Sequence, residues 1–140
     1  MTYPILAEQS VLGAIMLDAS VWPKVSAALG VDDFYDADHR AIFTAIGSLI
    51  EEGSPVDAVT MGDYFDMHSA FINRAYPVEI ANNTPSSANV MAYVEIVKKA
   101  SVRRSTAILY RQAADALDNT QARTEKVVER VEQRLKEIAE

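Results

Sequence analysis

Residues 84–117 read TPSSANVMAYVEIVKKASVRRSTAILYRQAADAL, and after Pro85 this stretch contains neither glycine nor proline. Thr84 can cap a helix whose first residue is Pro85, since the amide that proline lacks has no partner in a first helical turn. The valines at positions 90, 94 and 97 are spaced so that they share one helical face. The pattern predicts one long helix from residue 84 to about residue 117.

A second helix is predicted to follow a short polar turn at residues 118–121. Its apolar residues are spaced three, four and three apart, with charged residues between them: Val128, Val131, Leu135 and Ile138. Such a narrow apolar stripe is typical of a helix in a hairpin or a coiled coil. Two long helices joined by a short turn are most simply antiparallel. We therefore expect residues 85–140 to form an antiparallel helical hairpin.

The first part of the chain carries shorter helical patterns and no convincing strand. Helices are expected over residues 7–17, 18–29, 36–52 and 77–83, with a short one near residues 60–65. Gly13 within the first of them predicts close packing against another element. The expected capping side chains are Asp18 or Ser20, Asp36 or Asp38, and Thr60 paired with Asp63. The predicted fold class is all-α: a small helical globular subdomain, residues 1–84, followed by the C-terminal hairpin.

The composition is that of an ordinary globular domain. The chain has 140 residues, of which 49% are apolar and 24% charged, and it has no cysteine. The lack of cysteine excludes disulfides, thiol catalysis and cysteine-ligated zinc. No apolar run approaches the roughly 18 residues of a membrane span, and the start Met1-Thr2-Tyr3-Pro4 lacks the basic opening of a signal peptide. We expect a cytoplasmic protein that does not enter a membrane.

Charge is distributed unevenly along the chain. Residues 1–95 hold three basic and 13 acidic side chains, whereas residues 96–140 hold ten basic and seven acidic ones. An acidic globule cannot neutralise phosphates, so we expect no strong direct binding of nucleic acid. The basic residues at the start of the second zone form either a solvated helix face or a surface for an acidic partner, which includes the acidic part of a second copy. They are Lys98, Lys99, Arg103, Arg104 and Arg111.

The sequence offers no convergent set of catalytic residues. It has no glycine-rich phosphate loop, and its two histidines, His39 and His68, lack a second ligand one helical turn away. We therefore predict no catalytic, cofactor-binding or metal-binding residue and expect a non-enzymatic helical interaction module.

Six short motifs follow one another along the chain: AEQSVLG at 7–13 with MLD at 16–18, DDFY at 32–35, HRAIF at 39–43, EGSPVD at 52–57 with Thr60, NTPSSAN at 83–89 with Tyr93 and Ile96-Val97, and residues 123–140. Together, in this order, they resemble the N-terminal domain of DnaB-type replicative DNA helicases. The resemblance covers essentially the whole chain. The phosphate-loop ATPase of that family has no counterpart here, so the resemblance implies the helicase collar without its motor.

In that family the domain pairs with a second copy through its hairpin, three pairs form a collar, and the collar receives the helicase-binding domain of DnaG-type primase. The resemblance thus implies sister copies and primase as partners, in a dimer or a hexamer of three dimers. A helicase loader is a further candidate partner. Positions that match the family's primase-sensitive sites fall at Ala107, Ala113 and Val128, and the hairpin seam adds Val131 and Leu135 as partner-binding candidates.

Three functional hypotheses follow from these observations. The first is a collar domain that mediates oligomerisation and primase docking during DNA replication. The second is a stand-alone, phage-type adaptor or decoy that binds a host primase or helicase. The third is an unrelated enzyme for small molecules on a helical scaffold, which the missing acid, base and metal groups disfavour.

Overall fold

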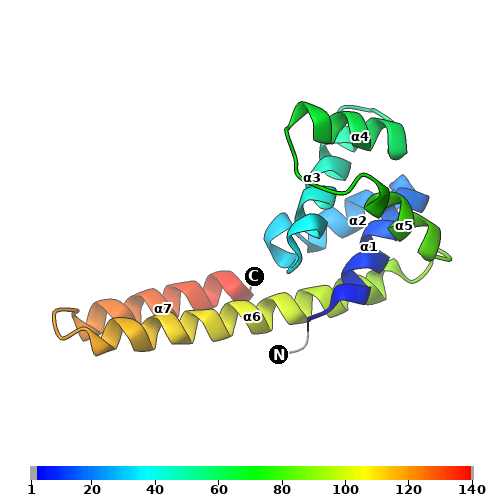
Figure 1. Ribbon diagram of the computed structural model, residues 1–140. Helices are drawn as coiled ribbons and strands as arrows, with labels where there is room; N and C mark the ends of the chain where they lie inside the picture. The colour runs from blue at the N-terminus through cyan, green and yellow to red at the C-terminus, as the bar shows by residue number, and fades with distance from the viewer. Residues whose placement is uncertain (1–2, 140) are drawn as a thin grey trace. The chain divides into compact units, whose positions relative to one another are not determined.

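The computed structural model describes residues 3–139, and every regular element among them is helical (Figure 1). The helices are α1 (Ile5–Leu17), α2 (Trp22–Ala28), α3 (Ala37–Glu51), α4 (Ala58–Met67), α5 (Ala75–Asn83), α6 (Val90–Asp118) and α7 (Thr124–Ala139). Two single turns of 3₁₀ helix, Ala19–Val21 and Val31–Asp33, lie between the early helices. The absence of a strand from residues 3–139 confirms the predicted all-α fold class.

The chain divides into two compact units, Met1–Lys98 and Lys99–Glu140. We expected a boundary after residue 84. In the structure the start of α6 belongs to the first unit, because Val90, Val94 and Val97 are buried in its core. The three valines share one face of the helix, as their spacing predicted.

The core of the first unit forms where α1 packs against α3 and α5 (Figure 1). Residues of α1 and α3 that lie three or four positions apart, such as Leu12, Ile15, Ile42 and Ile46, are fully buried. α1 and α5 approach each other at Gly13, where an added Cβ would collide with the side chain of Thr84. The predicted close packing at this glycine is therefore confirmed.

The first caps follow the sequence closely. Asp18 accepts the Ser20 N–H and caps the turn Ala19–Val21, and Asp36 accepts the N–H groups of Asp38 and His39 and caps α3. α3 is followed by Gly53, whose φ of 75° is a conformation that favours glycine.

Two of the predicted caps are wrong. Thr60 does not begin a helix, because the cap of α4 is Asp57: its carboxylate accepts the Thr60 N–H at 2.8 Å, and the Thr60 hydroxyl accepts the Asp57 N–H at 3.0 Å. Thr84 does not begin the long helix, because it ends α5 and its hydroxyl donates to the Ile80 carbonyl oxygen at 2.8 Å. The long helix begins at Val90 instead.

The second unit is a helical hairpin. α7 runs back along α6, and residues 119–123 connect them, with the Asn119 side chain accepting the Gln121 N–H (Figure 1). Leu109 of α6 is buried, whereas α7 has no fully buried residue among those described.

No single helix within residues 3–139 is long and apolar enough to cross a membrane. α1 and the segment Ala19–Ala28 reach that composition only as a pair, and they are bent by 114°. Their apolar side chains, such as Val11 and Val25, are buried in the core.

Candidate partner-binding surfaces

The outward side of α6 in the second unit carries a stripe of residues spaced four, three, four and three apart. We call this stripe the α6 seam: Arg103, Ala107, Tyr110, Ala114 and Leu117. Tyr110 and Leu117 are 54% and 49% exposed, so their own hairpin covers only part of each. This spacing is the one with which helices pack in coiled coils, and the two alanines allow a close approach.

A groove lies between the two helices of the hairpin, and it has a volume of about 370 Å³. We call it the hairpin groove. Its apolar lining comes from Leu109, Ala113, Ala116, Ala122, Val127 and Val131, and its cations are Arg123, Lys126 and Arg130. Cations along an apolar groove favour a partner that is both apolar and acidic.

The structure separates the three positions to which the resemblance assigned primase sensitivity. Ala107 belongs to the α6 seam, and Ala113 lines the hairpin groove. Val128 is 46% exposed, and it is Val127 that lines the groove, one residue and about 100° around the helix. The three residues therefore do not form one patch.

The other residues of the predicted α7 stripe stay close to the hairpin axis. Val131, Leu135 and Ile138 are half-buried, and Val131 also lines the hairpin groove. Val128 is the member of the stripe that remains available to a partner.

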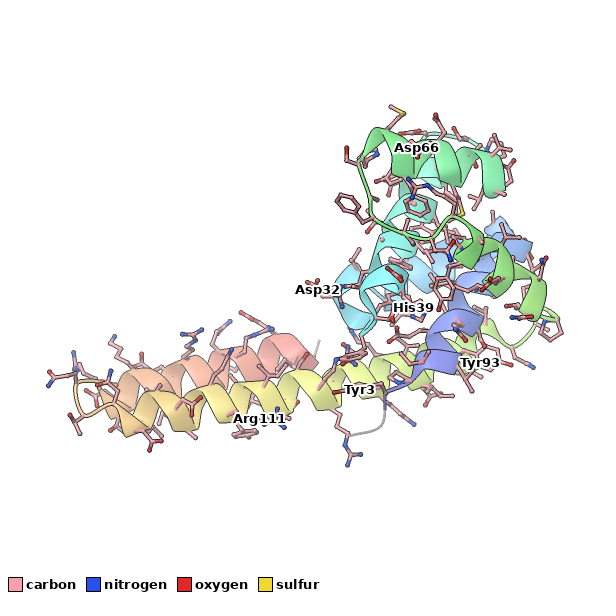
Figure 2. All side chains as sticks on the ribbon, viewed as in Figure 1. Tyr3, Asp32, His39, Asp66, Tyr93 and Arg111 are labelled. Carbon is pink, nitrogen blue, oxygen red and sulfur yellow. The ribbon has the colours of Figure 1, made fainter. Side chains whose placement is uncertain are left out.

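The predicted basic residues have different surroundings. Lys98 belongs to the first unit, and its ammonium lies 3.4 Å from the Asp33 carboxylate. Arg103 and Arg111 are exposed on α6, where Figure 2 labels Arg111, and Arg104 is half-buried. The exposed cations of the hairpin therefore begin beyond Lys98.

The first unit contains a buried polar network that our sequence reasoning missed. Glu8 and His39 are completely buried, and the His39 Nδ1 lies 2.7 Å from a Glu8 carboxylate oxygen (Figure 2). The His39 Nε2 lies 2.6 Å from the Tyr76 hydroxyl, which accepts a hydrogen bond from the Gln9 amide at 2.9 Å. The network joins α1, α3 and α5.

Every polar atom of this network has a partner when His39 is neutral. The Nδ1–H donates to the carboxylate, and the Nε2 accepts the proton of the Tyr76 hydroxyl. The carboxylate of Glu8 also accepts the N–H groups of Tyr35 at 2.7 Å and Asp36 at 3.3 Å.

The carboxylate, the imidazole and the hydroxyl are hydrogen-bonded in the same order as in a catalytic triad. In this network the hydrogen bonds join three helices, and the hydroxyl is not activated for reaction. Burial raises the pKa of the Tyr76 hydroxyl, and the charges of Asp36, Asp38 and Glu8 add to this, partly opposed by the hydrogen bond from Gln9. The phenol therefore stays protonated at neutral pH and is no activated nucleophile. Within residues 3–139 no cluster of three or more histidine, aspartate or glutamate side chains is placed to hold a metal ion.

A sequence signal for this network exists. Glu8 precedes Val11, Leu12 and Ile15 by three, four and seven residues, so it occupies the apolar face of α1. His39 stands in the same relation to Ile42, Phe43 and Ile46 on α3. A charged residue in register with an apolar stripe indicates a paired group in the core.

The sequence model of the DnaB-like helicase N-terminal domain family matches residues 1–99. The chain belongs to this family.

Known relatives extend the comparison. The chain is 38% identical over 104 residues to the replicative DNA helicase DnaB of Haemophilus influenzae, and 39% identical over 103 residues to the replicative DNA helicase DnaC of Bacillus subtilis. These matches cover 70% and 71% of the chain but only 22% and 23% of the relatives, so the chain spans less than a quarter of their length.

The crystal structure of the N-terminal domain of DnaB helicase from Mycobacterium tuberculosis matches with a TM-score of 0.88 at 26% identity. That match covers 97% of the chain and 99% of the mycobacterial domain. The DnaB sequence model ends at the start of the second unit, whereas the structural likeness continues through it. The resemblance to DnaB-type helicases stated from the motifs is thereby confirmed.

Proposed function

We propose that this chain acts as the N-terminal collar domain of a replicative DNA helicase, in the cytoplasm. In this role it assembles copies of itself through the hairpin and docks a DnaG-type primase there. The observation that carries the proposal is the α6 seam: a DnaB-like domain presents a coiled-coil spacing on the outside of its hairpin.

The seam supports pairing of two copies. Tyr110 and Leu117 are each about half exposed on the outward side of α6, and large apolar side chains in such a stripe gain by packing on another helix. A symmetric pair is the commonest way in which a single chain covers such a stripe. Three such pairs would make the hexameric collar that family membership suggests.

The test of pairing is Leu117→Asp, with the mass of the assembly measured by light scattering over a range of concentrations. A charge placed in the pairing seam should convert dimers into monomers. The matched control is Ile108→Asp, because Ile108 is 45% exposed but lies on the opposite side of α6. Circular dichroism verifies that both variants keep their helices. Equal masses for the two variants would contradict assignment of the pairing to the α6 seam.

Primase docking has a separate test on α7. Val128 is half exposed, so Val128→Asp should abolish capture of the primase helicase-binding domain without unfolding the hairpin. Gln133→Asp is the control, since this exposed residue lies well around α7 from Val128. A wild-type chain that stays monomeric yet captures primase would instead favour the adaptor hypothesis.

The proposed role includes no chemistry and no strong binding to nucleic acid. The acidic excess of residues 1–95 repels phosphates, and the hairpin cations can neutralise only a few of them. We therefore expect DNA binding that moderate salt removes, and no ATP hydrolysis by the isolated chain.

A further inference from the structure

The outward face of α4 is apolar and acidic at once. Val59 and Met67 are 80% and 74% exposed, and Asp63 and Asp66 lie between them on the same face (Figure 2 labels Asp66). Single exposed apolar residues are ordinary, but two nearly bare ones on a ten-residue helix are not explained by the packing of the first unit.

The two carboxylates on this face differ in whether they form an ion pair. Asp66 is paired with Arg74, whose Nη2 lies 2.7 Å from the Asp66 carboxylate. Asp63 is exposed and has no ion-pair partner among residues 3–139. One carboxylate on the face is therefore available to a cation from elsewhere.

The hairpin groove is also apolar, but its charged residues are cations. Leu109, Val127 and Val131 line its apolar part. Among its cations, Lys126 lies 3.7 Å from Glu129 on the same helix, while Arg130 has no ion-pair partner within the described residues.

We propose that α4 of one copy docks into the hairpin groove of a second copy. Val59 and Met67 enter the apolar part of the groove, and Asp63 faces Arg130. A hairpin is a poor occupant, because residues 99–139 hold nine basic and six acidic side chains and would bring cations against cations. Residues 3–98 hold four basic and 13 acidic side chains, so the first unit of another copy complements the groove in charge as well as apolarity.

This contact differs from the pairing proposed for the α6 seam. It joins two different surfaces, so it is heterologous, and such contacts build rings or open filaments rather than closed pairs. Of the groove residues on α6, Ala116 lies about 100° around the helix from Leu117, whereas Ala113 borders the α6 seam, about 40° from Leu117.

The natural absence of cysteine allows a direct test by cross-linking. Met67→Cys in a tagged chain is mixed with Lys126→Cys in an untagged chain, and a short bismaleimide joins thiols that lie close together. The control partner is Glu132→Cys, since this exposed residue lies on the side of α7 away from the groove. We expect the mixed product with Lys126→Cys to form about tenfold faster than with Glu132→Cys. Equal rates would overturn the proposal.

Charge reversal tests the predicted ion pair. Asp63→Lys and Arg130→Glu should each lower the yield of the mixed product about tenfold, and a chain that carries both should recover it. Glu51→Lys is the matched control, an exposed carboxylate at the end of α3. Failure of the double variant to recover, with wild-type circular dichroism, would refute the pairing of Asp63 with Arg130.

Two further outcomes decide who occupies the groove. A chain with both cysteines that cross-links only within itself, at a rate independent of concentration, would overturn docking between copies. Protection of Lys126→Cys by a bound primase helicase-binding domain, together with no cross-link between copies when primase is absent, would assign the groove to primase and refute the proposal. Leu117→Asp should leave the α4 cross-link intact, so a failure of the seam and a failure of the groove are told apart.

Discussion

Replacing Glu8 by alanine should strongly destabilise the first unit. The variant removes the carboxylate that accepts hydrogen bonds from His39, Tyr35 and Asp36, at 2.7, 2.7 and 3.3 Å. A buried donor left without an acceptor costs about 1–3 kcal/mol, and this variant removes the acceptor of three donors. Glu8 and His39 are completely buried, so in the native fold bulk solvent does not reach the bond between them. We expect the free energy of unfolding to fall by about 4 kcal/mol.

Urea unfolding followed by tryptophan fluorescence measures this loss in the first unit of the chain, which contains Glu8. Trp22 is the one tryptophan of the chain, and its ring packs against Phe43 in the first unit, with centroids 5.0 Å apart. With a dependence of about 1.5 kcal/mol per molar urea, a loss of 4 kcal/mol moves the midpoint down by about 2.5 M. Such a loss is a large share of the total stability of a domain.

Glu8→Gln is the matched control. Its amide oxygen can accept the Tyr35 N–H while its amide nitrogen donates to the His39 Nδ1, whose proton then moves to the Nε2. Only the longest bond, from Asp36, is lost, so we expect the glutamine variant to cost less than half as much as alanine. A midpoint shift for Glu8→Ala as small as that of an exposed residue, or equal shifts for the two variants, would refute the reasoning.

Gly13→Ala should lower the free energy of unfolding by about 2 kcal/mol, since the new Cβ collides with Thr84. Gly62→Ala on α4 should raise it by about 0.5–1 kcal/mol, because beyond the neighbouring residues and backbone of its own helix no atom lies within 4 Å of the added Cβ. Urea unfolding measures both, and a stabilised Gly13→Ala would contradict the close approach. Hydrogen bonds from the first turn of α4 lower the pKa of Asp57 below 3.8, so this carboxylate stabilises the fold above pH 3.8 and the stability is lost as the pH falls further. In thermal melts recorded as a function of pH, Asp57→Asn should reduce the loss of stability below pH 3.8. An unchanged loss of stability would exclude Asp57 as its source. Leu135 is half-buried in the hairpin, so Leu135→Asp should reduce the helical signal of the second unit while the tryptophan transition stays in place; a folded monomer would show instead that the residue is shared between copies.

The long helices were predictable because their apolar residues repeat over several turns. The stripes of α1, α3 and α6 each bury the residues that the spacing selects. Caps were less predictable, since several polar residues near a helix start can each serve. Asp57 rather than Thr60 caps α4, because an ionised carboxylate is a stronger hydrogen-bond acceptor than a hydroxyl. Thr84 does not cap α6, because its hydroxyl donates to the Ile80 carbonyl oxygen at the end of α5.

The candidate surfaces were predictable in place but not in detail. The sequence located them in the hairpin, yet α7 contains overlapping apolar stripes, one through Val127 and one through Val128. Which stripe faces α6 depends on the rotation of each helix about its own axis when the two helices pack. The spacing of apolar residues within one helix does not determine that rotation. The α6 seam escaped notice because two of its members are alanines and one is an arginine.

The network of Glu8, His39 and Tyr76 also constrains how this sequence can change over generations. The three residues come from helices that are far apart in the chain, and His39 links the other two through one hydrogen bond to each. A buried polar group can often be replaced by apolar residues of equal volume without loss, but only when all members change together. A single replacement by an apolar residue removes one hydrogen-bonding group and leaves another buried group without its partner. Lineages of this domain should therefore keep all three residues or none, and an alignment that shows intermediate combinations should also show a neighbouring residue that has taken over the missing hydrogen bond.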